Sequence, residues 1–115
     1  MLRFTTGQFV SLDSKLDSSR DAALVVYARR RFGAHLRAAP HARLLEAAQE
    51  ARRLAFGWGM RHEADVATVF DLAVMYGGSF ANADWAADIL QASDIDGGDK
   101  AEALRARVRR TVPGF

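Results

Sequence analysis

The stretch HEADVATVFDLAVMYGG, residues 62–78, decides the fold class. Its large apolar residues recur at intervals of three and four, which is the period of one buried helix face. Glu63 and Asp65 lie near its start, where negative charge favours a helix N-terminus, and a pair of glycines ends it. The pattern therefore predicts a helix over residues 63–76. The predicted buried face comprises Val66, Val69, Phe70, Ala73 and Val74.

The segment before this helix has the same period. Residues 40–56 repeat leucine and alanine at helical spacing behind Pro40, which suits the first turn of a helix. The turn Gly57-Trp58-Gly59 follows, and Gly57 is the expected left-handed cap. We therefore predict a helix over residues 40–56. Its expected buried face comprises Leu44, Ala48, Ala51 and Ala55.

The N-terminal part predicts two further short helices. One covers residues 4–16 and the other about residues 20–37, with Ser18 or Ser19 as the N-cap of the second. Gly33 lies inside the second helix and weakens it modestly. The expected apolar stripes are Phe9, Leu12 and Leu16 in the first helix, and Leu24, Val25, Ala28, Phe32 and Leu36 in the second.

The C-terminal part predicts two more helices after a loop in which Phe80 anchors the core. A helix over about residues 83–92 is expected, with Asn82 as its N-cap. A last helix is expected over about residues 99–111. The expected buried residues are Trp85 and Ile89 in the first of these helices, with Leu90 as a further candidate, and Ala101, Leu104 and Val108 in the second.

Composition agrees with a helical protein. The chain has 115 residues, half of them hydrophobic, and alanine, the best helix former, accounts for 22 of the apolar residues. No segment alternates apolar and polar residues as a half-buried strand does. We predict an all-α, compact single-domain bundle of five to six short helices that covers residues 1–115. No run of about 18 apolar residues predicts a membrane span, and the first residues do not predict a signal peptide.

The sequence lacks motifs typical of metal binding, cofactor binding or catalysis. There are 0 cysteines, which excludes disulfides, thiolate metal sites and cysteine nucleophiles, and fits a reducing cytoplasm. The acidic turn from Asp94 to Asp99 begins like a calcium loop, but Asp99 and Arg105 stand where glycine and a bidentate glutamate are required. No phosphate loop, nucleophile elbow or HExxH zinc pattern occurs. We therefore expect no metal, no cofactor and no catalytic residues.

Charge is distributed unevenly along the chain. Residues 1–61 carry a net charge of +6, residues 62–102 carry −8, and residues 103–115 carry +4. Either these segments pack together and neutralise one another, or one patch stays exposed and meets an oppositely charged partner. The candidate basic face comprises Arg29, Arg30, Arg52 and Arg53, and the candidate acidic face comprises Asp84, Asp88, Asp94 and Asp96.

Two tryptophans lie at turns or helix starts. Trp58 falls between two glycines, and Trp85 falls at the start of an expected helix. Aromatic residues at such places either staple the core or anchor an interface, because tryptophan is over-represented in binding hot spots. Both are therefore candidate partner-binding residues, and both readings stay open.

One region resembles a known family. The segment AFGWGMRHEADVA, residues 55–67, continues through Phe70, Gly77 and Phe80 to WAADIL, residues 85–90. This order of turns and helix starts resembles a family of small helical proteins encoded in bacterial type VI secretion gene clusters, near effector and spike genes. The resemblance implies a helical, non-enzymatic protein, and it brings no catalytic residues to this chain.

These observations together predict a non-enzymatic protein-interaction module. The resemblance implies an accessory protein of a type VI secretion system, of adaptor, chaperone or immunity type, that acts in the cytoplasm and binds an effector or spike component. The alternative is a small nucleic-acid-binding protein that uses its arginine-rich face. A small enzyme or toxin and a homodimer of packed helices are further alternatives.

Overall fold

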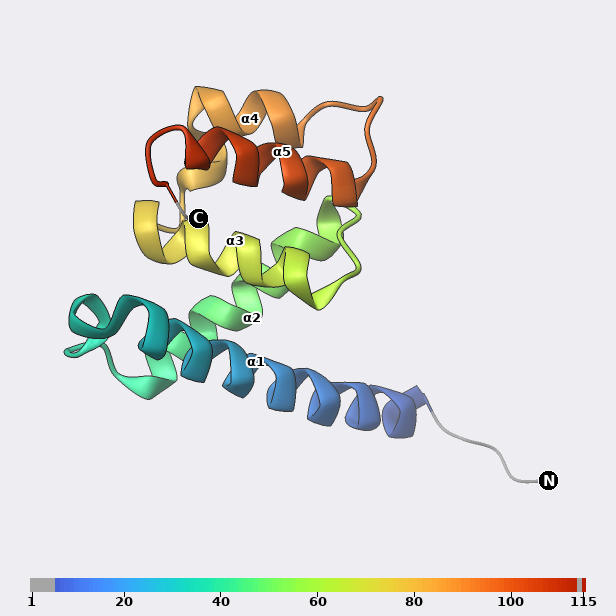
Figure 1. The fold of residues 1–115 in the computed structure, drawn as a ribbon. Coiled ribbons are helices and arrows are strands. Elements are labelled where there is room, and N and C mark those ends of the chain that lie inside the picture. The colour runs from blue at the N-terminus through green and yellow to red at the C-terminus, as the bar shows by residue number, and fades with distance from the viewer. Residues whose placement is uncertain (1–5, 114) are drawn as a thin grey trace. The chain divides into compact units, whose positions relative to one another are not determined.

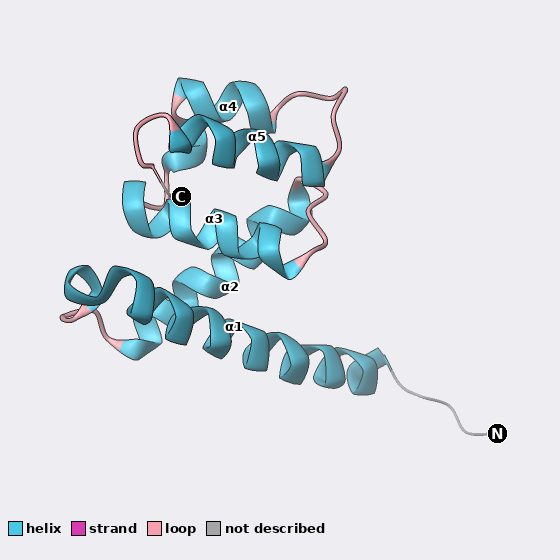
Figure 2. Ribbon diagram, viewed as in Figure 1, coloured by secondary structure: helices cyan, strands magenta, loops and turns pink. Residues whose placement is uncertain are grey.

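The computed structural model describes residues 6–113 and 115, with side chains from Ser19 onward, and its ordered elements are all helices (Figures 1 and 2). They are α1 (Thr6–Leu36), α2 (His41–Gly57), α3 (Glu63–Tyr76), the 3₁₀ turn η1 (Phe80–Asn82), α4 (Asp84–Leu90) and α5 (Gly97–Arg109). No strand occurs among the described residues. The predicted all-α class with five to six helices is confirmed.

The chain divides into two compact units, residues 1–45 and residues 46–115. The boundary falls inside α2, so this one helix contributes to both units. The description of residues 1–115 as one domain stays a prediction. No helix in the described part of the chain is both long enough and apolar enough to cross a membrane.

The N-terminal unit corrects one prediction. The helices expected over residues 4–16 and 20–37 are joined in one element, α1, which is unbroken from residue 6 to residue 32, and Ser18 and Ser19 lie inside it rather than capping a second helix. Neither glycine nor proline occurs between residues 8 and 32, and serine lowers helix stability by only a few tenths of a kcal/mol. The helix therefore runs through the serines without a break.

Gly33 marks the bend near the end of α1. Its φ of 14° and ψ of −87° lie outside the helical region, so the helix is kinked there. The guanidinium of Arg29 closes this end of the helix, because it donates hydrogen bonds to the carbonyl oxygens of Leu36 at 3.1 Å and Ala39 at 2.9 Å. Arg29 therefore acts as a cap within its own unit.

Burial in the N-terminal unit follows most of the predicted stripe. Leu24, Val25, Ala28, Leu36 and Leu44 are buried. Phe32 is only half-buried, which corrects its assignment to the core. The predicted stripe of Phe9, Leu12 and Leu16 lies outside the residues whose side chains the structure describes.

Helix α2 ends at Gly57, one residue later than predicted, and its left-handed cap lies two residues after the predicted one. The left-handed residue is Gly59, with φ of 82°, whereas Gly57 is still helical, so the prediction of Gly57 as the cap is wrong. The amide of Met60 donates to the carbonyl of Ala55 at 2.9 Å and the amide of Gly59 donates to Phe56 at 3.0 Å. These two bonds form a Schellman motif, and Met60 and Ala55, which the longer bond joins, are both fully buried.

A second glycine makes this turn fit against α5. A Cβ atom added to Gly97 would lie 2.2 Å from the carbonyl carbon of Gly59 and 2.5 Å from the amide nitrogen of Met60. Both neighbours are backbone atoms, which cannot rotate away as a side chain can. The start of α5 and the Gly59 turn therefore pack backbone against backbone, and only glycine fits at position 97.

The C-terminal unit holds a core in which α5 packs against α3 and α4, while η1 packs against α3 and α4. Figure 1 shows α5 running alongside α4 and over α3. The predicted bounds of α3 and the predicted anchoring by Phe80, which is 3% exposed, are confirmed. The predicted core residues that are buried are Ala48, Ala51, Ala55, Val66, Val69, Phe70, Ala101, Leu104 and Val108.

Helix α4 differs from its prediction in start and in face. Ala83 occupies the N-cap position and no side chain caps the helix, so Asn82 is not the N-cap. The buried residues are Ala86 and Leu90. Leu90 was the further candidate for this face, whereas Trp85 and Ile89 are only half-buried. Part of the Trp85 side chain is therefore accessible. Ala73 and Val74 in α3 are likewise half-buried rather than core residues.

Candidate functional site

A pocket of about 170 Å³ opens within the C-terminal unit. Tyr76 at the end of α3 and Trp85 on α4 form one part of its wall, and Arg107 and Val108 on α5 form another. Thr111, which follows α5, completes the lining. We call these five residues the aromatic–arginine pocket. Its lining combines large apolar surface with one guanidinium.

The two aromatic rings of the pocket hold each other in place. The ring centroids of Tyr76 and Trp85 lie 5.7 Å apart with an interplanar angle of 66°. This edge-to-face geometry is favourable, because the positive ring edge meets the negative ring face. Tyr76 is nevertheless 44% exposed, and Trp85 is half-buried. The pair therefore presents a fixed aromatic surface that is open to a ligand.

Arg107 supplies the positive charge of the pocket. Its guanidinium carbon lies 5.9 Å from the centre of the Trp85 ring, which is within the range of a cation–π contact. Among the residues that the structure places, Arg107 forms no ion pair. A guanidinium carries five N–H donors, and the ring face uses none of them in a directed bond. Arg107 therefore keeps donors for an incoming acceptor.

The charged residues near the pocket are basic at the end of α5 and acidic on α4. Arg110, one residue before Thr111, is exposed and has no ion pair within the described ranges. Asp84 and Asp88 flank Trp85 on α4, and both are exposed. Neither of these carboxylates lines the pocket. The α5 side of the pocket is therefore basic, while acidic groups lie outside it on α4.

One member of the predicted basic face is buried. Arg52 is 4% exposed, and its guanidinium forms a bidentate ion pair with Glu63, with Nη2 2.8 Å from Oε1. This pair joins α2 to the first residue of α3. Arg52 is therefore a buried structural residue, which corrects its assignment to an exposed face.

The other three predicted arginines have separate surroundings. Arg53 is exposed and its Nε donates to Glu50 at 2.9 Å on the same helix. That hydrogen bond lowers the pKa of the Glu50 carboxyl below its usual value. Arg29 caps α1, as described above, and Arg30 is exposed. Of the four arginines, Arg30 is the one whose side chain forms no ion pair or hydrogen bond with a described residue.

Neighbouring arginines on α2 give a matched stability prediction. We expect Arg52→Met to lower the free energy of unfolding by about 1–3 kcal/mol, because it removes a buried cation and leaves the Glu63 carboxylate without it. Arg53→Met should change it far less, since both partners of that pair are exposed and solvent screens their interaction. Urea unfolding of the two variants measures the difference, and equal losses would contradict the structural role of Arg52.

The two tryptophans have different roles. Trp58 is half-buried and meets Phe80 edge to face, with centroids 6.4 Å apart and an interplanar angle of 73°. Because Phe80 belongs to the core, Trp58 staples the turn after α2 to that core. Trp85 instead lines the pocket. Of the two candidate partner-binding tryptophans, only Trp85 is part of the aromatic–arginine pocket.

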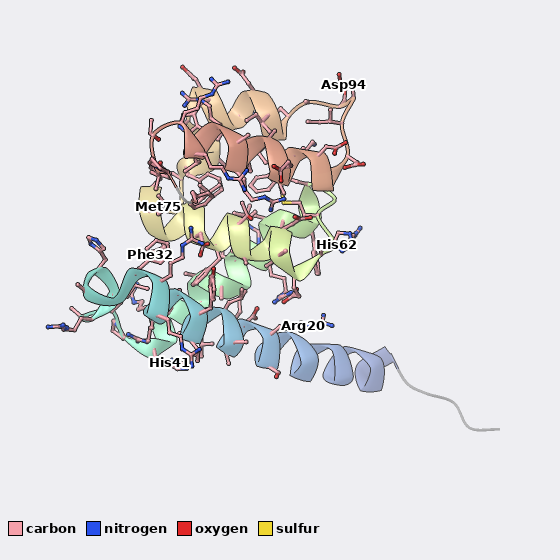
Figure 3. All side chains as sticks on the ribbon, viewed as in Figure 1. Arg20, Phe32, His41, His62, Met75 and Asp94 are labelled. Atoms are coloured by element: carbon pink, nitrogen blue, oxygen red, sulfur yellow. The ribbon has the colours of Figure 1, made fainter. Side chains whose placement is uncertain are left out.

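The predicted acidic face is exposed throughout: Asp84, Asp88, Asp94 and Asp96 all face solvent. Asp96 accepts a hydrogen bond from the amide of Asp99 at 2.8 Å, so it is the N-cap of α5. Asp94 lies at the loop between α4 and α5, and His41 and His62 are exposed (Figure 3). No group of three acidic or histidine side chains in residues 19–113 is arranged to hold a metal ion.

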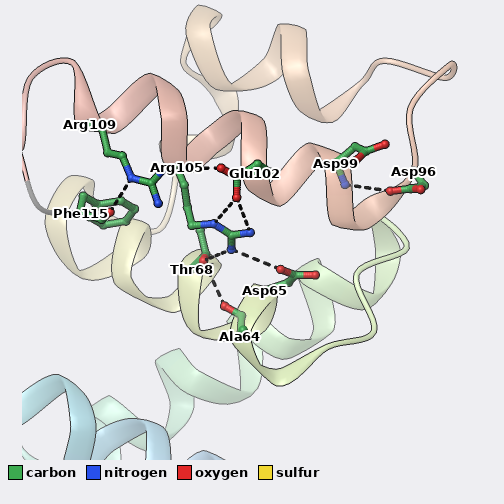
Figure 4. A network of polar contacts seen from close by, with 9 residues as sticks. All are labelled: Ala64, Asp65, Thr68, Asp96, Asp99, Glu102, Arg105, Arg109 and Phe115. Carbon is green, nitrogen blue, oxygen red and sulfur yellow. Dashed lines mark hydrogen bonds and ion pairs between the residues drawn. The ribbon is translucent and has the colours of Figure 1, made fainter.

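A polar network between α3 and α5 escaped the sequence analysis (Figure 4). Arg105 donates to the Thr68 hydroxyl at 2.8 Å and to the Asp65 carboxylate at 3.3 Å, and it pairs with Glu102 at 3.0 Å. The Thr68 hydroxyl in turn donates to the carbonyl of Ala64 at 3.1 Å. We call these contacts the α3–α5 network. They hold one face of α5 against α3. Arg105 lies two residues before the pocket residue Arg107 in the sequence.

The network predicts a pH dependence at its exposed end. The hydrogen bond and charge of Arg105 lower the pKa of Glu102 below its usual 4.5. The stabilisation is therefore present above pH 4.5 and is lost as the pH falls through the lower, folded-state pKa. We expect Glu102→Gln to lower the unfolding temperature slightly at neutral pH and to leave it unchanged in acid. Thermal melts of both proteins over this range check it, and a constant difference would contradict it.

Comparisons of the chain with models of known protein families, with curated proteins and with solved structures find no match. What the fold and the site define is thus an all-α protein with an aromatic–arginine pocket. Sequence reasoning found Trp85 but missed Tyr76, Arg107 and Thr111. One signal was available, because Arg107 and Thr111 are four residues apart and therefore lie on one side of the chain at the end of α5.

Proposed function

We propose that this chain is a non-enzymatic protein-interaction module that binds a protein partner at the aromatic–arginine pocket. The observation that carries the proposal is the combination of exposed Tyr76, accessible Trp85 and an Arg107 without an ion pair in the described residues. Tryptophan, tyrosine and arginine are the residue types most enriched in binding hot spots, especially in preformed pockets. The edge-to-face pair also limits the side-chain entropy lost on binding.

The class of partner comes from the sequence resemblance alone. On that basis the chain is an accessory protein of a type VI secretion system, of adaptor, chaperone or immunity type, and it binds an effector or spike component in the cytoplasm. The pocket is compatible with this role, since it offers one anchor point and leaves the identity of the partner to surrounding contacts. The homodimer remains an alternative outcome of the test.

Nucleic-acid binding receives less support. Of the four arginines proposed for a basic face, Arg52 is buried with Glu63, Arg53 pairs with Glu50 and Arg29 caps its own helix. Phosphate contacts require arginines that are exposed and aligned along one surface. This observation favours the protein partner over the nucleic acid.

Co-expression with the products of neighbouring genes tests the proposal. We expect the tagged chain to retain an effector or spike protein at equal stoichiometry in moderate salt, and Arg107→Ala to lose most of it. Arg61→Ala is the matched control, because Arg61 also lies over an exposed aromatic ring, that of Phe56 at 5.5 Å, but lines no part of the pocket. Circular dichroism verifies that both variants are folded.

Two results would contradict the proposal. Equal retention of the partner by Arg107→Ala and Arg61→Ala would exclude the pocket as the binding site. Recovery of nucleic acid, or of the chain alone, in place of a neighbouring gene product would favour the nucleic-acid or homodimer alternatives.

A further inference from the structure

Resting on the proposed function, we infer that the aromatic–arginine pocket recognises one phenyl-sized apolar side chain followed by a carboxylate in the partner. The apolar side chain packs against the Tyr76–Trp85 pair, and the carboxylate binds Arg107. The partner segment is therefore acidic. The size, the aromatic wall and the charge of the pocket each support a part of this inference.

The size of the pocket sets the size of the anchor. Its volume is about 170 Å³, and an engineered protein cavity of about 150 Å³ is known to hold a benzene molecule. The space therefore accepts one ring-sized or branched aliphatic side chain, and a whole peptide segment is too large for it. Buried Val108 adds a further apolar residue to the lining.

The charge of the pocket sets the sign of its neighbour. Arg107 lines the pocket and forms no ion pair with any residue that the structure describes. Its contact with the Trp85 ring orients the planar guanidinium, so fewer rotamers are lost when a carboxylate binds two of its N–H groups. Arg110, three residues after Arg107, is exposed and adds positive charge at the end of α5.

Two features oppose an anion: the C-terminus of α5, whose last turn lines the pocket, and the carboxylates on α4. The C-terminus of α5 carries a partial negative charge, but Arg107, Arg109 and Arg110 offset it with full positive charges. Asp84 and Asp88 lie on α4 and are absent from the pocket lining. The group that an incoming side chain meets inside the pocket is therefore a guanidinium, which selects a carboxylate over an ammonium.

Capped tetrapeptides test this selection directly. The probes are acetyl-Gly-Phe-Glu-Gly-amide, the same peptide with lysine for glutamate, and the same peptide with alanine for phenylalanine. The chain has 2 tryptophans, so its indole N–H groups give two separate NMR signals. The signal of Trp85 reports the pocket, and that of Trp58, which packs on Phe80, is the internal reference. A Trp58→Phe variant assigns them.

We expect the Phe-Glu peptide to shift the Trp85 signal with a dissociation constant on the order of 1 mM, as a single side-chain anchor allows. The lysine and alanine peptides should bind at least about fivefold more weakly, a difference of about 1 kcal/mol. Arg107→Gln should remove the preference for glutamate over lysine, while Arg61→Gln should retain it. Higher salt should weaken the Phe-Glu peptide most.

The inference would be overturned if the glutamate and lysine peptides bound equally. It would also be overturned if the Trp85 signal stayed unchanged at a high concentration of the Phe-Glu peptide. These failures are distinct from failure of the proposed function. If co-purification of the partner depends on Arg107 but the peptides show no charge preference, the pocket binds a partner of another chemistry. If co-purification is independent of Arg107, the proposed function itself fails.

Discussion

Gly97→Ala is expected to destabilise the protein more than any other single methyl addition in the C-terminal unit, by about 3 kcal/mol. The added Cβ would lie 2.2 Å from the carbonyl carbon and 2.3 Å from the carbonyl oxygen of Gly59, and 2.5 Å from the Met60 amide nitrogen. These atoms belong to the hydrogen-bonded turn that ends α2, so relief of the clash requires α5 or the turn to move.

The neighbouring glycine provides the control. A Cβ added to Gly98 meets Asp96 Oδ1 at 3.5 Å and Asp65 Oδ2 at 4.0 Å, which are ordinary contact distances. Gly98→Ala should therefore leave stability unchanged or raise it by up to about 1 kcal/mol, because alanine favours the helix. Urea unfolding measures the free energy of unfolding of both variants, and its dependence on urea concentration should be the same for the two. Equal and small effects would show that the two backbones do not touch.

The sequence predicted helices well where strong signals ended them. Helix α3 lies between acidic N-terminal residues and the Gly77-Gly78 pair, and its bounds match. The predicted division of α1 at Ser18 and Ser19 is wrong. A serine caps a helix where the backbone leaves the helical conformation, but the same residue is tolerated inside a helix that continues. At the end of α2 two glycines competed, and the choice of Gly59 depends on the contact of Met60 with Ala55, which sequence does not show.

The candidate site was less predictable than the fold. Tyr76, Trp85 and Arg107 come from three helices, and they meet only because α4 buries Ala86 and Leu90 instead of the tryptophan. Arg52 was interpreted as a surface charge. Its position, four residues after Ala48 and three before Ala55, places it on the edge of the buried stripe of α2, and this spacing was the available signal.

Arg105→Met should have the second largest effect, a loss of about 2–4 kcal/mol in the free energy of unfolding. The substitution keeps apolar volume but removes the cation that faces Asp65, whose side chain is only 7% exposed. It also removes the donor to the Thr68 hydroxyl, 2.8 Å away. A buried carboxylate and a hydroxyl would then lose a partner together. Arg110→Met, an exposed change beside the same helix, should stay within about 0.5 kcal/mol.

A second substitution separates loss of charge balance from loss of packing. If the buried carboxylate causes the damage, Asp65→Asn in the Arg105→Met background should recover part of the lost stability, because no buried charge then lacks its partner. Asparagine forgoes about 0.3–1 kcal/mol of helix-dipole stabilisation at the start of α3, so recovery will be incomplete. A double-mutant cycle by urea unfolding should give a coupling energy of about 1–3 kcal/mol. Additive losses would show that the ion pair of Arg105 with Asp65 contributes little, and that Arg105 supports α5 through its packing and its contacts with Thr68 and Glu102.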